Sequence, residues 1–223
     1  SVDKQDNKTT WVFLFRLTAF ALAAGFWTYY VGRKPFDASA GWRYLTNWGL
    51  TLNLLVASWA VAARWVSKLN DHNPVLPVAL TVSSMVVILY WGLYLIDPNL
   101  VNAKGGLPWY SELYMHLGTT IFVYSEAFLL NSAPKRRLQS LIPVAVVGLS
   151  YILWVDQVVA TSNSTPCGLT TENCGYPYPF LNDLSSATRL GFYLFAGTAM
   201  LALSATIHWI WSKVQPQEAT SIL

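Results

Sequence analysis

The sequence is poor in charged residues and in the residue types that bind metals. Asp, Glu, Lys and Arg make up 11% of the 223 residues, less than half of the roughly 25% that is typical of soluble domains. This leaves too little charge to cover the surface of a water-soluble enzyme. The chain has only three His and two Cys, and its net charge of +3 is not gathered in a basic cluster. The composition therefore gives no support to nucleic-acid binding.

Motifs that mark several common chemistries are also missing. The sequence contains no G-x-S-x-G nucleophile elbow, no G-x-x-x-x-G-K phosphate-binding loop and no G-x-G-x-x-G turn. A zinc site needs several His, Cys or carboxylate ligands close together, and Glu112 with His116 supplies only two. We therefore expect no metal and no cofactor.

Apolar and aromatic residues are abundant instead, at 54% and 15% of the chain. This composition excludes a disordered protein and predicts one that is embedded in a membrane. Mostly apolar runs of about 20 residues, the length that a helix needs to cross the bilayer, cover residues 11–31, 44–63, 75–96, 113–131, 138–160 and 190–211. Backbone groups in lipid must be bonded within their own segment. We therefore predict an all-α polytopic membrane protein, with one domain (residues 1–223) of six transmembrane helices.

Six spans place both termini on one side of the membrane, here called side B, opposite side A. More Lys and Arg flank side B, so the positive-inside tendency predicts that both termini are cytoplasmic. The longest loop lies on side A and contains Cys167 and Cys174, which a local disulfide would join in an oxidising compartment. The expected location is the endoplasmic reticulum or plasma membrane, with a mitochondrial membrane as the alternative.

Ionisable residues at membrane depth are functional candidates, because they are costly to place there. Arg16 and Glu126 both lie about five residues in from side B, so we predict a structural ion pair between them. Near side A, Thr46, His116 and Asp156 each lie about one turn from the end of a different span. The sequence therefore predicts a polar layer in the side-A leaflet.

His116 is the only histidine at a depth suited to chemistry near side A. Glu112 is four residues before it, on the same helix face, and could hold one imidazole nitrogen while the other acts as a general base. The hydroxyl residues that such a base could activate are Thr46, Ser111, Thr119 and Thr120. Spacing does not choose among them, and a simple packing role for Thr46 and His116 remains the alternative.

Four ordered segments resemble the androgen-induced-gene family of integral membrane proteins, which includes the androgen-dependent regulator of tissue factor pathway inhibitor and fungal relatives. They are residues 42–50 (WRYLTNWGL), 114–120 (YMHLGTT) followed by Glu126, 150–155 (SYILWV), and 175–181 (GYPYPFL) followed by Arg189. The family is known as a group of threonine hydrolases of fatty acid esters of hydroxy fatty acids. The resemblance implies that Thr46 and His116 are its catalytic threonine and histidine. Our chain departs from the family in its longer loop, residues 161–182, and at Asp156 and Gln157.

The mechanism that the resemblance implies is covalent acyl transfer. Glu112 or Asp156 would orient the histidine, and Asn47, Tyr29, Tyr30 or Tyr94 would supply the donors for the oxyanion, by residue type and depth. The expected partners are membrane lipids and a lipid-ester substrate. The alternative function is a non-catalytic scaffold or accessory subunit, whose aromatic residues would contact other membrane subunits.

Overall fold

The structure is a computed structural model that describes residues 2–33, 41–66, 73–102, 106–162 and 175–214. Most of these residues are helical and none of them forms a strand, which confirms the all-α prediction. Cys167 and Cys174 lie outside the described residues.

Six long helical rods account for most of the described chain. Their segments, with the shorter helices between them, are α1 (Val2–Trp27) and η1 (Thr28–Gly32), η2 (Gly41–Arg43), α2 (Leu45–Ala62), α3 (Leu76–Ile96), α4 (Asn99–Asn102), α5 (Trp109–Leu113) with η4 (Tyr114–Gly118) and α6 (Thr119–Leu130), α7 (Leu138–Leu153) with η5 (Trp154–Val159) and α8 (Ala160–Ser162), α9 (Pro179–Asp183), and α10 (Ser186–Val214). The fourth rod begins at Trp109, earlier than the predicted residue 113, because Pro108 precedes it as its N-cap. His116 therefore lies deeper in its helix than the sequence suggested.

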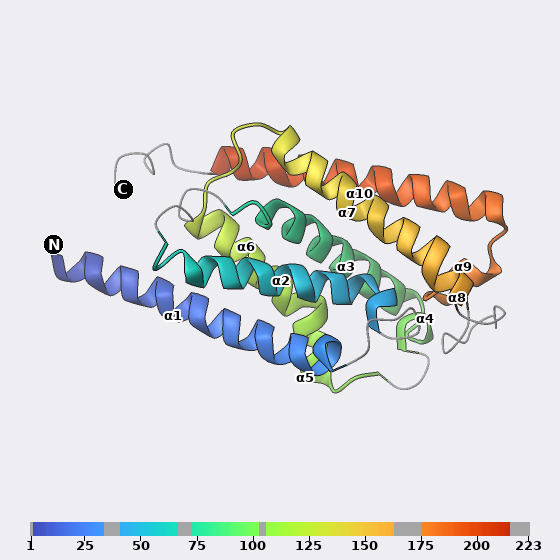
Figure 1. Ribbon diagram of the computed structural model, residues 1–223, viewed down its shortest axis with the longest axis horizontal. Helices are drawn as coiled ribbons and strands as arrows, with labels where there is room; N and C mark the ends of the chain where they lie inside the picture. Colours follow the sequence, from blue (N-terminus) through green and yellow to red (C-terminus); the bar gives the residue numbers. More distant parts are fainter. Residues whose placement is uncertain (1, 34–40, 67–72, 103–105, 163–174, 215–223) are drawn as a thin grey trace.

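Successive rods run in opposite directions, so that the start of α1 and the end of α10 lie at the same end of the bundle (Figure 1). We keep the name side B for that end and side A for the opposite end, where α1 ends and α2 begins. The third rod, α3, is central, since it contacts α2, α6, α7 and α10 and is buried from Leu76 to Val86. Of the elements that carry the predicted polar layer, α2 and η4 contact α3.

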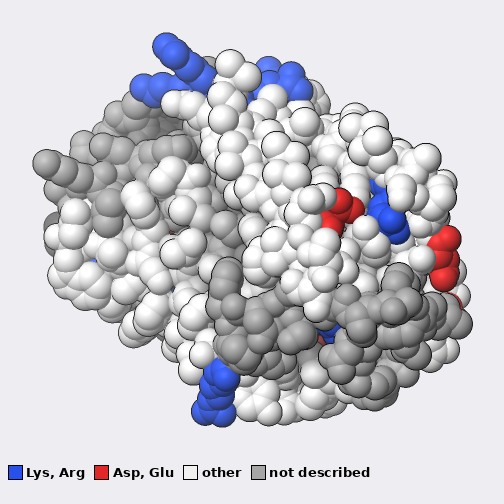
Figure 2. Space-filling model, turned by 45° about the vertical axis from the view of Figure 1, so that its right-hand side comes forward, with Lys and Arg blue, Asp and Glu red and all other residues white. Residues whose placement is uncertain are grey.

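Four helices are long and apolar enough to cross a membrane: Thr10–Gly32, Leu76–Ile96, Leu138–Ser162 and Ser186–Val214. Together with the low charge of the face in Figure 2, this indicates an integral membrane protein. The prediction of six spans is not confirmed. Helix α2 and the rod from Trp109 to Leu130 do not reach the same combination of length and hydropathy, because they carry buried polar residues such as Asn53 and Glu126.

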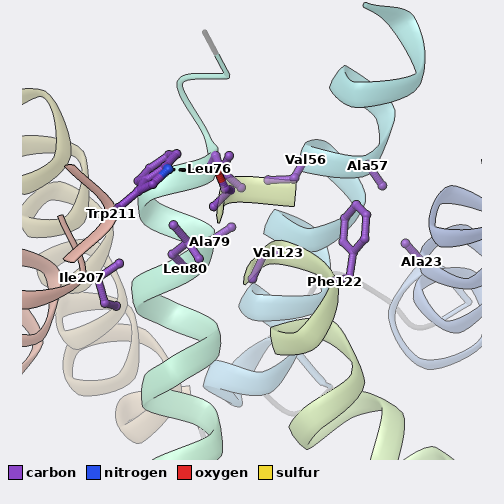
Figure 3. Close-up of a cluster of buried hydrophobic side chains, with 11 residues drawn as sticks. Ala23, Val56, Ala57, Leu76, Ala79, Leu80, Phe122, Val123, Ile207 and Trp211 are labelled. Atoms are coloured by element: carbon purple, nitrogen blue, oxygen red, sulfur yellow. Dashed lines mark hydrogen bonds between the residues drawn. The ribbon is translucent and has the colours of Figure 1, made fainter. Parts of the chain in front are cut away.

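The largest core cluster lies where α1, α2, α3, α6 and α10 meet (Figure 3). Small side chains such as Ala23, Ala57 and Ala79 allow these helices to approach closely, which is what holds helices together in lipid. Trp211 of α10 fills the remaining space, and its indole N–H donates to the backbone oxygen of Ala127 at 2.9 Å. Packing and directed hydrogen bonds such as this one therefore fix how these helices lie against one another.

Two polar contacts tie the side-B half together. Arg16 Nη2 lies 2.6 Å and Arg16 Nε 3.2 Å from the two carboxylate oxygens of Glu126, which joins α1 to α6. Asn131 also donates to Glu126 Oε1, at 2.8 Å. His208 Nδ1 lies 3.0 Å from Ser140 Oγ and links α10 to α7. Neither contact involves the side-A layer, so both serve the architecture.

Candidate active site

Three helices change to π-helix at their side-A ends, in η1, η4 and η5. Such segments are rare in proteins and are frequent at functional sites. They contain Tyr29 and Tyr30, His116 and Asp156, which are members of the polar layer that the sequence predicts. The irregular backbone and the polar residues therefore occur together at one end of the bundle.

The imidazole of His116 is buried and held by aromatic side chains of α3. The centroids of its ring and of the Tyr90 ring lie 3.5 Å apart, and the indole N–H of Trp91 donates to the His116 backbone oxygen at 3.2 Å. Its Nε2 is 3.9 Å from Glu112 Oε2, while its Nδ1 is buried without a hydrogen-bond partner. One nitrogen thus faces a carboxylate and the other is uncommitted.

Glu112 is itself fixed in position. Its Oε2 accepts from the Tyr90 hydroxyl at 2.8 Å, and its Oε1 accepts from the backbone N–H of Leu107 at 2.7 Å. Asp156, the other residue predicted to orient the histidine, instead accepts from Tyr176 at 3.0 Å and from Gln157 at 2.6 Å. Of the two carboxylates, the structure therefore brings only Glu112 to the imidazole.

Thr46 lies in the first turn of α2, on the same helix face as Leu50 and Asn53. Leu50 belongs to a cluster with Met115 of η4, and Asn53 Nδ2 donates to the Tyr114 hydroxyl at 3.3 Å. The face of α2 that carries Thr46 is therefore the one that meets η4, the segment of His116.

The register of α2 against α3 gives the depth of Thr46. Gly49, one turn after Thr46, faces Val82 and Val86, since a Cβ built there would lie 3.8 Å from a methyl group of each. The next residue one turn along α3 toward side A is Tyr90, which carries the imidazole of His116 on its ring. Thr46 and His116 thus belong to the same turn of the α2–α3–η4 contact, although no hydrogen bond joins them in the described chain.

In the described chain the hydroxyl of Thr46 makes no hydrogen bond to the carbonyls three and four residues earlier, which belong to η2 rather than to α2 and accept from other donors. A threonine on a helix normally donates to the carbonyl three or four residues earlier, as Thr51 does to Asn47 at 2.9 Å. The Trp42 carbonyl accepts from the indoles of Trp48 and Trp154 at 3.0 and 3.1 Å. The Arg43 carbonyl accepts from the Tyr151 hydroxyl at 3.0 Å.

The three other hydroxyl candidates are engaged. Ser111 accepts from the Tyr30 hydroxyl at 2.7 Å, Thr119 donates to its own helix, and Thr120 donates to the Ser83 carbonyl on α3. Within the described residues, Thr46 has no hydrogen bond to its side chain. Among the four hydroxyl residues that spacing could not separate, the hydrogen bonds therefore favour Thr46 as the nucleophile candidate.

The four residues predicted to donate to the oxyanion differ in exposure and in whether their donors are already used. Tyr29 is 61% exposed and Tyr94 36% exposed, on the outer surface of the bundle, and the Tyr30 hydroxyl proton is given to Ser111. Asn47 is buried, and its amide donates to the Gly41 carbonyl at 2.6 Å. Because an amide nitrogen carries two protons, Asn47 retains one donor next to Thr46 in the chain.

Sequence reasoning missed an apolar cavity of about 110 Å³ between α3, α7 and α10. Its walls include Leu45, Met85, Tyr151, Tyr178 and Tyr193. Neither Thr46 nor His116 lines it, but Leu45, the residue before Thr46, does. Gly148 on α7 and Gly197 on α10 also line the cavity, and such glycines in bulky apolar helices are the sequence signal for a gap.

Comparison with known proteins supports the resemblance seen in the sequence motifs. A search of curated proteins and a search of solved structures found no match. The family model described as FAR-17a/AIG1-like protein matches residues 11–212, which include the whole candidate site and every helix that forms it. The chain therefore belongs to the FAR-17a/AIG1-like family, the androgen-induced-gene family that its motifs resemble.

Proposed function

We propose that the protein is an intramembrane lipid-ester hydrolase in which Thr46 is the nucleophile and His116 the general base. The observation that carries this proposal is the uncommitted hydroxyl of Thr46, on the face of α2 that meets the segment of a buried histidine. The histidine has one free nitrogen and one that faces a carboxylate. Membership of the family is consistent with a membrane hydrolase.

The reaction has two balanced steps. In the first, His116 Nδ1 takes the proton of Thr46, and the threonine oxygen attacks the ester carbonyl. The carbon–oxygen ester bond breaks, and the leaving alkoxide takes the proton back from His116. In the second step His116 takes a proton from a water molecule, whose oxygen attacks the acyl carbon; the acyl–threonine bond breaks, the fatty acid is released, and the Thr46 oxygen takes the proton from His116.

Two further residues have supporting roles in this mechanism. Glu112 stabilises the imidazolium that forms when His116 is protonated, and it keeps the ring in one orientation. The remaining amide proton of Asn47 is the donor best placed in the chain to stabilise the oxyanion.

The proposed substrates are fatty acid esters of hydroxy fatty acids or similar lipids. An ester with long acyl chains enters from the lipid at the level of the first turn of α2. The apolar cavity beside Leu45 offers space for one of the chains close to Thr46 in sequence. No residue of this mechanism requires a cofactor.

A serine/threonine-hydrolase phosphonate probe tests the proposal on the purified full chain. The wild type and Thr46→Ser should be labelled, and Thr46→Ala should not. Thr51→Ala is the matched control, since it removes a hydroxyl from the same helix that is already bonded to Asn47 and to the indole of Trp27. Folded wild type that neither takes the label nor cleaves a lipid ester would overturn the proposal and favour an accessory-subunit role.

A further inference from the structure

The side chain of Arg43, at the end of η2, is buried and has no counter-ion among the described residues. The residue is 5% exposed, and both Nε and Nη1 are buried without a hydrogen-bond partner. Its side-chain contacts are a hydrogen bond from Nη2 to the Tyr44 hydroxyl at 2.9 Å and a cation–π contact, with Cζ 5.0 Å from the centroid of the Tyr44 ring. Within the described residues no carboxylate lies within ion-pair distance of it. We infer that Arg43 binds the free carboxylate of a long-chain acid, and so selects carboxylate-bearing lipid esters for the hydrolase proposed above.

Two partly buried arginines, Arg16 and Arg189, have the partners that Arg43 lacks. Arg16 is paired with Glu126. Arg189 donates to the carbonyls of Leu181 and Leu184 at 2.8 and 3.0 Å. A buried guanidinium without such partners is unfavourable, and its planar array of N–H donors matches a carboxylate in a two-pronged bond. The unused donors of Arg43 therefore fit an anionic group that the protein itself does not supply.

The position of Arg43 links the candidate nucleophile to the apolar cavity. Its carbonyl accepts from Tyr151, which lines the cavity. The ring of its partner Tyr44 lies 6.3 Å from that of Tyr178, another lining residue, and Arg43 precedes Thr46 by three residues. A ligand with a carboxylate, an ester and an apolar chain thus finds a complementary group for each part within this region.

This inference rests on the proposed function for the identity of the ester. Fatty acid esters of hydroxy fatty acids keep a free carboxylate on the alcohol half, whereas a methyl ester or a triacylglycerol has none. Arg43 therefore gives a chemical reason for preferring the former class over neutral esters.

Binding without turnover is the first test. Purified full-length protein in phosphatidylcholine nanodiscs is titrated with a fluorescent long-chain fatty acid and with the fatty alcohol of the same length. The wild type and Thr46→Ala should bind the acid at least about tenfold more tightly than the alcohol. Arg43→Gln should remove this preference, and Arg43→Lys should retain part of it. Equal binding of acid and alcohol by the wild type, or an undiminished preference in Arg43→Gln, would overturn the inference.

Two controls separate recognition from folding. Arg33→Gln removes a charge from an exposed arginine at the same end of the bundle and should keep the preference. A loss there equal to that of Arg43→Gln would show a general surface-charge effect and overturn the inference. Thermal unfolding without ligand should show that Arg43→Met is at least as stable as the wild type, since it removes an unpaired buried charge. A large destabilisation of Arg43→Met would instead assign Arg43 a structural role.

Hydrolysis is the second test. The wild type should cleave an ester that has a free carboxylate faster than the methyl ester of the same compound, and Arg43→Gln should lose this selectivity. Thr46-dependent hydrolysis without selectivity would overturn the inference and leave the hydrolase proposal standing. Acid-selective binding without any hydrolysis would support the role of Arg43 and overturn the hydrolase proposal.

Discussion

The ion pair between Arg16 and Glu126 allows a quantitative test of what holds α1 against α6. The carboxylate is 1% exposed and the guanidinium 18% exposed, so the pair is shielded from water and is placed within an apolar bundle. Removing one partner of a buried pair typically costs about 3–5 kcal/mol, because the other charge stays buried without compensation. Asn131 would still donate to Glu126 after Arg16→Met. We therefore expect Arg16→Met to lower the free energy of unfolding by about 3 kcal/mol, at the low end of that range.

The double variant Arg16→Met/Glu126→Leu distinguishes a buried charge from lost packing. Replacing both partners with apolar side chains of similar size is often neutral or stabilising, and Asn131 keeps its bond to the Glu126 backbone oxygen at 3.0 Å. We expect the double variant to lie within about 1 kcal/mol of the wild type. The assay is denaturant or thermal unfolding in one detergent, followed by tryptophan fluorescence.

Arg64→Met is the matched control, since Arg64 is exposed at the same end of the bundle, and it should change stability by less than about 0.5 kcal/mol. The reasoning fails if Arg16→Met costs no more than Arg64→Met. It also fails if the double variant is as unstable as Arg16→Met, since the burial of an uncompensated carboxylate could then not be the cause.

Three further outcomes are expected at the side-A end. Glu112→Gln should lower kcat for ester cleavage about tenfold, or ~1.4 kcal/mol, and change the pH profile, because His116 loses the negative charge that stabilises its protonated form; an unchanged profile would remove Glu112 from the mechanism. Gly197→Leu should fill the apolar cavity, because Gly197 lines it and a Cβ there meets nothing within 4 Å, and should reduce binding of long acyl chains more than of short ones, as measured by the chain-length dependence of binding. Trp154→Phe removes one of the donors to the Trp42 carbonyl, which leaves that carbonyl able to accept from the Thr46 hydroxyl. Probe labelling of Thr46 should therefore slow while the protein stays folded. Unchanged labelling would show that the indoles do not keep the Thr46 hydroxyl free.

The class of protein follows from composition and run length, because apolar segments of about 20 residues with so little charge have few alternatives to a membrane helix. The helices indeed cover all of the predicted runs, but not every run is apolar enough to count as a span by itself. Helix α2 and the rod that carries His116 place their polar residues toward the inside of the bundle. Mean hydropathy cannot anticipate this, since it does not record which face of a helix meets lipid.

The sequence by itself determined an all-α membrane protein, a polar layer near one end and the family. Counting from helix ends also put Arg16 level with Glu126, since depth along a straight helix depends only on residue number. Tertiary structure alone decided which hydroxyl stays free and which arginine lacks a partner. Besides the nearby indole of Trp48, the donors to the carbonyls of Trp42 and Arg43 are Trp154 and Tyr151, more than a hundred residues further along the chain. Hydrogen bonds between segments that far apart exist only once the helices have packed, and no local pattern encodes them.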